Sequence, residues 1–223
     1  MREVLLDLIA RMTMQEPRCL NSDDSISWHA HREAEKLIES SMVDELANYV
    51  RHEPDRKHRG AAYFILGKLG QKVRAADCAS ILLSHVRSET NKYVLSRLLD
   101  AVGGVPKPRE LDLSAIFELL HDERWLVRHS AIQALRQTDS SEAEDRILIH
   151  LDKTTDPHDM IYCHATLSEI GTTKALPLIE RNLKSRKRDV KASAQWAIEA
   201  INARMRGQSP AGRSTFETPY GPR

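Results

Sequence analysis

The chain has 223 residues, enough for one domain or one array of repeats with a substantial core. Its 33 lysine and arginine residues and 32 aspartate and glutamate residues leave a net charge of +1, so the total charge indicates neither a nucleic-acid nor a membrane ligand. Glycine and proline are scarce, and aromatic residues make up only 5%. This composition favours helices that pack through small and aliphatic side chains.

The chain begins with two predicted helices, residues 1–15 and 27–40, separated by a turn. Charged residues at Glu3 and Asp7 interrupt the first apolar stretch, which is therefore an amphipathic helix, and we expect no secretory signal. No stretch approaches the ~18 apolar residues of a membrane span, so we expect no membrane contact.

The three cysteines, Cys19, Cys78 and Cys163, lie far apart in the sequence. Their odd number and wide spacing fit neither a disulfide framework nor a metal site. They are expected to be small buried residues of a reducing compartment, which predicts a cytoplasmic protein.

After residue 40, five segments repeat one helical pattern. Each has a leucine or isoleucine anchor, at Leu66, Leu99, Leu135, Leu167 and Ile198, and a small or apolar residue four positions earlier, at Ala62, Leu95, Ala131, Cys163 and Ala194. A glycine often follows and is expected to end the helix, as at Gly70, Gly103 and Gly171. A second apolar segment lies between successive copies, at 42–50, 75–86, 112–120, 143–151 and 175–183. This regular spacing predicts a stack of antiparallel helix pairs, in which neighbours cover each other's apolar faces.

Segments such as DERWLVRHSAIQAL (122–135) resemble HEAT repeats of the short type, also found in phycobilin lyase subunits and related bacterial scaffolds. The resemblance covers residues 41–203 and implies an all-α fold, a right-handed α-α superhelix of about six helix pairs. Residues 1–40 would then be a divergent capping pair. Residues 204–223 contain almost no aliphatic side chains and are expected to be a flexible tail.

In HEAT proteins the second helix of each pair lines the concave surface, and the resemblance implies the same for the five repeated segments. At 100° per residue, three positions of each segment point away from the core. Aromatic and polar residues at these positions are the predicted partner-binding residues: Phe64, Tyr93, Arg97, His129, Gln133, Arg136 and Trp196. Outward aromatic and arginine side chains are typical of protein-binding patches.

Charge is divided between the halves of the array. Residues 54–120 carry 11 basic and 7 acidic residues, whereas 121–183 carry 7 basic and 11 acidic. A basic concave face favours a protein partner with an acidic surface, and nucleic acid is the less favoured partner. Basic residues seven positions before the anchor, at Arg59, Lys92, Arg128 and Lys191, are expected to brace neighbouring repeats through carboxylates.

The sequence predicts no catalytic residues, no metal site and no cofactor. His29 and His31, with Glu33 and Glu35, have i,i+4 spacing, but each pair supplies only two metal ligands. The favoured function is therefore a non-catalytic scaffold or adaptor for protein–protein interaction. Two alternatives depend on the resemblance alone: a nucleic-acid-binding protein or DNA alkylation-repair-type glycosylase, which would use Trp125, and a phycobilin lyase-like subunit.

Overall fold

The computed structural model describes residues 2–17 and 21–208. Its α-helices are α1 (Glu3–Thr13), α2 (Ile26–Ala34), α3 (Ser41–His52), α4 (Arg56–Gly70), α5 (Ala75–His85), α6 (Lys92–Gly103), α7 (Ser114–Leu119), α8 (Trp125–Ala134), α9 (Ser141–Lys153), α10 (Pro157–Ile170), α11 (Leu176–Asn182) and α12 (Arg188–Met205). Short 3₁₀ turns precede α2 and α11. The described ranges contain no strand, only one isolated bridge between Lys107 and Thr138. The prediction of an all-α fold is confirmed.

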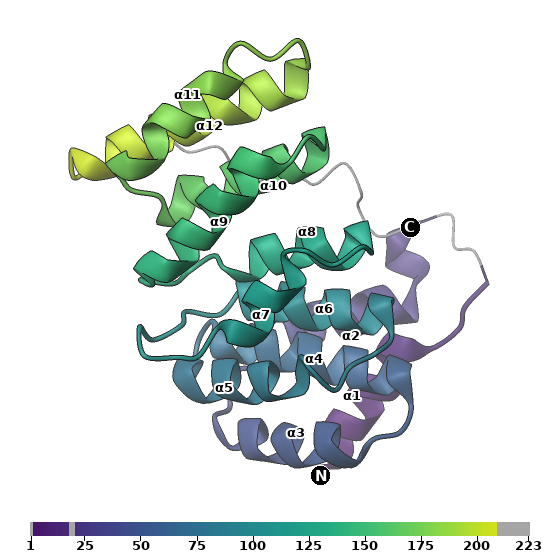
Figure 1. Cartoon of the computed structure of the whole chain (residues 1–223). Coiled ribbons are helices and arrows are strands. Elements are labelled where there is room, and N and C mark those ends of the chain that lie inside the picture. Colours follow the sequence, from purple (N-terminus) through teal and green to yellow (C-terminus); the bar gives the residue numbers. More distant parts are fainter. Residues whose placement is uncertain (1, 18–20, 209–223) are drawn as a thin grey trace.

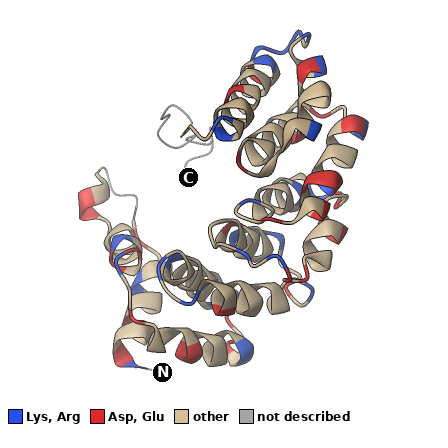
Figure 2. Cartoon of the chain, turned by 90° about the vertical axis from the view of Figure 1, so that its left-hand side faces the viewer, with Lys and Arg blue, Asp and Glu red and all other residues tan. Residues whose placement is uncertain are grey.

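From α3 onward the helices alternate between two rows (Figure 1). The inner row consists of α4, α6, α8, α10 and α12, which pack directly on one another, and the outer row of α3, α5, α7, α9 and α11. Because neighbouring helices make closer contact in the inner row than in the outer row, the stack curves around the inner row. Figure 2 shows this open curve. The predicted superhelix of stacked helix pairs is confirmed.

Small side chains allow this close approach. The five residues predicted at helix contacts, Ala62, Leu95, Ala131, Cys163 and Ala194, are all buried. A Cβ atom added to Gly103 would lie 2.7 Å from the carbonyl oxygen of Gln133, so α6 passes α8 at backbone distance. Among the described glycines only Gly207 has a positive φ angle. Gly103 is the last residue of α6, as the sequence predicted, and its missing side chain also allows the close packing on α8.

The first two helices form a pair of their own. Helix α1 packs against both α2 and α4, and it buries Leu5, Leu8, Ile9 and Met12. Helix α2 ends at Ala34, earlier than the predicted 27–40 helix. In Figures 1 and 2 this pair lies at one end of the curve, beside the first helices of the inner row.

At the other end, α12 continues to Met205, into the segment predicted to be a flexible tail. Most of that segment, residues 209–223, lies outside the described residues. No helix in the described part of the chain has both the length and the apolar character needed to cross a membrane.

Candidate functional site

A groove of about 980 Å³ opens between α2, α4 and α6. One wall consists of Trp28, His31 and Arg32 on α2 and Glu35 just after it. The other residues that line the groove are Gly60, Ala61, Phe64, Gly67 and Lys68 on the outward face of α4, Gln71 just after α4, Arg97, Asp100 and Ala101 of α6, and residues of the segment that leads from α1 into α2. We call it the inner groove. Its volume lies at the upper end of the about 300–1,000 Å³ that is usual for small-ligand pockets.

Local hydrogen bonds fix the start of α2 and hence one wall of the groove. The Ser25 hydroxyl accepts the backbone N–H of Trp28 at 3.1 Å and so caps the helix. The Glu16 carboxylate accepts the backbone N–H groups of Ile26 and Ser27, at 2.6 and 3.1 Å, and the Ser25 hydroxyl at 2.9 Å. Hydrogen bonds, those from Ser27 first, lower the pKa of Glu16 to about 2.

Two aromatic side chains face the groove. The half-buried ring of Phe64 meets the His31 ring edge to face, with ring centroids 5.1 Å apart, and the Lys68 ammonium lies 5.2 Å from the Phe64 centroid. Trp28 is 38% exposed, and the Arg32 guanidinium lies 4.3 Å from its ring centre. The Phe64–His31 contact joins α4 to α2, and the Trp28 ring is partly exposed where it lines the groove.

Helix α6 contributes one cation and one carboxyl group. Arg97 is exposed and forms no ion pair with any described residue. Asp100 is reached by solvent at the groove surface but is surrounded by the inner helices. This partial desolvation raises the pKa of Asp100 to about 6. A hydrogen bond from Ser130 and the positive charge of Arg97 lower the pKa by less than desolvation raises it.

Of the predicted binding residues, the structure brings only Phe64 and Arg97 together in the inner groove. Tyr93 is 62% exposed on α6, with Lys92 over its ring, but it does not line the groove. Arg136 is half-buried in an ion pair with Glu169 of the next repeat. Gln133 and Trp196 are half-buried on α8 and α12 and do not line the groove.

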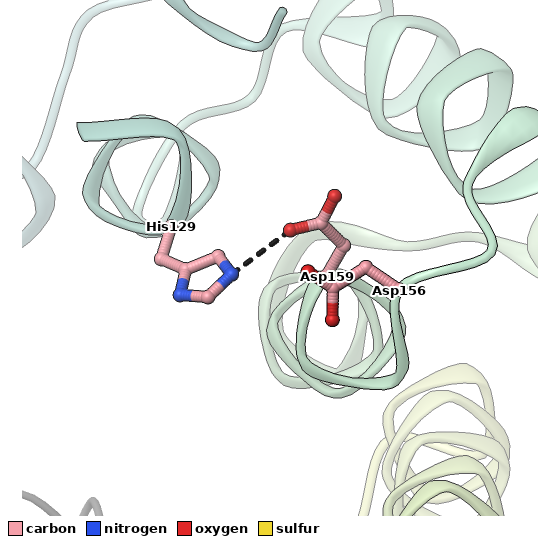
Figure 3. A group of neighbouring side chains, drawn as sticks. All are labelled: His129, Asp156 and Asp159. Carbon is pink, nitrogen blue, oxygen red and sulfur yellow. Dashed lines mark hydrogen bonds and ion pairs between the residues drawn. The ribbon is translucent and has the colours of Figure 1, made fainter. Parts of the chain in front are cut away.

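His129 was predicted to point outward and is instead buried, with 6% of its surface exposed. Its ring stacks on Tyr162 of the next inner helix, with centroids 4.4 Å apart, and its Nε2 lies 2.9 Å from an Asp159 oxygen (Figure 3). The prediction of an outward His129 is wrong because the following repeat covers the position.

Asp159 is the centre of a polar cluster that joins α8, α9 and α10. Its buried carboxylate contacts His129, His150 at 3.2 Å, the Thr154 hydroxyl at 3.1 Å and the Arg128 Nε at 2.9 and 3.0 Å. Burial alone would raise the pKa of Asp159, but these hydrogen bonds outweigh it and hold the pKa far below its usual value.

The same cluster contains the one group in the described residues that has the spacing of a metal site, His129, Asp156 and Asp159 (Figure 3). The Arg128 guanidinium contacts both carboxylates, at 2.9 Å to Asp159 and 3.4 Å to Asp156. A metal ion there would stand beside an existing positive charge, so the arrangement favours a structural ion-pair network over a cation site.

Two of the four predicted bracing residues span repeats. Arg59 makes a two-point contact with the Glu89 carboxylate, at 2.9 and 3.1 Å, and Arg128 pairs with Asp159. Lys92 and Lys191 are exposed and form no ion pair with any residue of the described ranges. Arg59 and Arg128 therefore brace neighbouring repeats, and Lys92 and Lys191 do not form such ion pairs with described residues.

Sequence reasoning missed the α2 wall of the groove. Trp28, His31, Arg32 and Glu35 recur at helical spacing on one face of a short, otherwise polar helix. An exposed tryptophan on such a helix is the available signal, but nothing in a non-repeated segment indicates which inner helices it will face.

The fold and the inner groove together define a superhelical repeat protein with an open groove between α2, α4 and α6. Residues 113–199 match the family model for HEAT repeats. This part of the chain is therefore similar to HEAT repeats. No curated protein matches the chain.

Solved structures of engineered proteins share the fold. A designed armadillo repeat protein is 15% identical, with a TM-score of 0.51, 89% of this chain covered and 100% of the other. Two crystal structures of engineered proteins show 17% and 16% identity and TM-scores of 0.51 and 0.53. The first of these covers 93% of this chain and 99% of the engineered chain, and the second covers 91% and 100%. Similarity at this identity extends to the fold alone.

Proposed function

We propose that the chain is a non-catalytic scaffold that holds a segment of a protein partner in the inner groove. The observation that carries this proposal is the pair of partly exposed rings, Trp28 and Phe64, beside the unpaired cation Arg97. Tryptophan and arginine in a preformed hollow are the residues that dominate protein–protein binding energy.

The closely packed inner row supports the proposal. Gly67 and Gly103 allow α4, α6 and α8 to approach at near-backbone distance, so the groove floor is rigid before a partner arrives. A rigid surface loses little conformational entropy on binding, and more of the contact energy is available as affinity.

The alternative of phosphate-backbone binding near Trp125 has less support. Arg124 there pairs with Asp122 at 2.6 Å, and Arg128 pairs with Asp159. Cations already neutralised by carboxylates attract a nucleic-acid backbone weakly.

We infer the same reducing compartment that the sequence predicted, because Cys78 and Cys163 are both buried and unpaired.

Selection of peptides from a phage-displayed random library, followed by affinity measurements on the selected peptides, tests the proposal. Trp28→Ala should weaken binding at least about tenfold, the loss expected for a hot-spot aromatic residue. The matched control is Trp125→Ala, since Trp125 is more exposed, at 57%, but does not line the groove. Equal effects of the two substitutions, or no selected peptides, would count against the inner groove as a binding site.

A further inference from the structure

The charges of the inner groove are unevenly satisfied. Glu35 is shared by two cations, Arg32 at 2.7 Å and Lys68 at 3.3 Å. The Glu16 carboxylate is held by hydrogen bonds from the residues that begin α2. Arg97 is left without an ion-pair partner among the described residues. A guanidinium in this state attracts a carboxylate from outside the chain.

Gly60 helps to set the position of Arg97. If residue 60 had a Cβ atom, the Arg97 Cδ would lie 3.5 Å from it and Nη1 3.7 Å from it. The Arg97 side chain therefore lies across α4 at a point where that helix has no side chain of its own. The guanidinium therefore lies over the floor of the groove, where a ligand can reach it.

Phe64 follows Gly60 by four residues on the same face of α4. Positions four apart on a helix are neighbours, about 5–6 Å from each other. The cation and the open Phe64 ring therefore lie about one helical turn apart, and the Trp28 ring stands on the facing wall.

We propose that the occupant of the groove is a protein segment that presents a large apolar side chain and a carboxylate about one helical turn apart. This inference rests on the proposed function and names the chemistry of the partner. The carboxylate pairs with Arg97, and the apolar side chain covers the rings of Phe64 and Trp28. Asp100, the acidic residue of α6, is close enough for the Arg97 charge to lower its pKa, but it forms no ion pair with Arg97 and accepts a hydrogen bond from Ser130.

Fluorescence polarisation with three labelled helical peptides tests this assignment. The first carries leucine and glutamate one turn apart, and the other two carry glutamine or lysine in place of that glutamate. We expect the glutamate peptide to bind at least tenfold tighter than the lysine peptide. Arg97→Glu should reverse this order, and Arg97→Gln should abolish the preference.

Arg56→Glu is the matched control for charge. Arg56 is exposed on the same helix as Gly60 and Phe64, forms no ion pair within the described ranges and does not line the groove. It should leave the order of the three peptides unchanged. Circular dichroism and thermal unfolding of each variant establish that the fold is retained.

The outcomes separate this inference from the proposed function. If all three peptides bind equally and Trp28→Ala still weakens their binding, the carboxylate assignment is overturned. The groove would then still be a protein-binding site. Binding of none of them would overturn the assignment even if library peptides bind. Displacement of the glutamate peptide by a single-stranded oligonucleotide, or blockage of the groove by a second copy of the chain in sedimentation experiments, would also overturn it.

Discussion

Gly67 of α4 faces Ala101 of α6 so closely that a Cβ atom on residue 67 would lie 2.9 Å from the Cβ of Ala101 and 3.1 Å from its Cα. Gly60, two turns earlier, has an ordinary 3.5 Å distance to the flexible side chain of Arg97. The two glycines of one helix thus differ: Gly67 sets the spacing of α4 and α6, whereas Gly60 lies beneath a groove side chain without being needed for its space.

Alanine substitution should distinguish these roles. Gly67→Ala must push the two helices apart and should lower the free energy of unfolding by about 1–3 kcal/mol. Gly60→Ala should raise it by up to about 1 kcal/mol, because alanine has the higher helix propensity and meets no clash. Urea denaturation followed by circular dichroism measures both, and a stabilising Gly67→Ala would contradict the close approach of α4 and α6.

The repeat contact predicted from the sequence can be tested at Ala131. Ala131→Leu adds volume at a buried contact of α8 and should lower the free energy of unfolding by about 1–3 kcal/mol. Ala192→Leu makes the same chemical change at an exposed position of α12 and should be nearly neutral. Similar urea midpoints for the two variants would show that Ala131 is not at a helix contact.

The Asp159 cluster should be a major contribution to stability. Asp159→Ala leaves Arg128 and two buried imidazoles without their shared acceptor and should cost about 3–5 kcal/mol. Asp156→Ala removes a helix cap and a longer contact, and should cost only about 0.5–2 kcal/mol. Guanidinium denaturation compares them, and equal losses would argue against Asp159 as the centre of the cluster.

Stability should fall in mild acid through His164. Burial lowers the pKa of this histidine from 6.5 to about 4, where Nδ1 contacts the Ser193 hydroxyl at 2.9 Å. Between these two pH values the unfolded chain binds a proton that the folded chain does not. Stability is therefore full above pH 6.5 and decreases as the pH drops toward 4, by roughly 3 kcal/mol for this group.

Urea denaturation at several pH values between 7.5 and 4.5 measures this dependence. His85, whose pKa burial also lowers, acts in the same direction. Asp100 acts in the opposite direction because its pKa is raised. The relevant quantity is therefore the difference between the native chain and His164→Gln, which should have the flatter profile. Parallel profiles would assign the acid sensitivity to other groups.

The sequence predicted the buried positions well because each inner helix repeats one pattern against an equivalent neighbour. Leu66, Leu99, Leu135 and Leu167 are fully buried, as the pattern requires. Ile198 is only partly buried. It lies on α12, and no further helix follows α12 in the described residues to pack against it.

Helical spacing predicted the outward positions less reliably than the buried ones. Helical spacing pointed Phe64 and Arg97 outward, and both line the groove, but it also pointed His129 outward, and His129 is buried. A rotation of 100° per residue describes one helix and contains no information about the side chains of the next. Tyr162 and Asp159 reach across from α10 and bury the His129 ring.

The sequence by itself determined the helices, their pairing into repeats and the small side chains between them, because these depend on local periodicity and on contacts between equivalent neighbours. Only the tertiary structure decided that a groove exists and that Trp28 forms its wall. That arrangement depends on how α2, which has no equivalent in the array, packs on α1 and faces α4 and α6 across the groove. Contacts between unlike segments leave no periodic trace in a sequence.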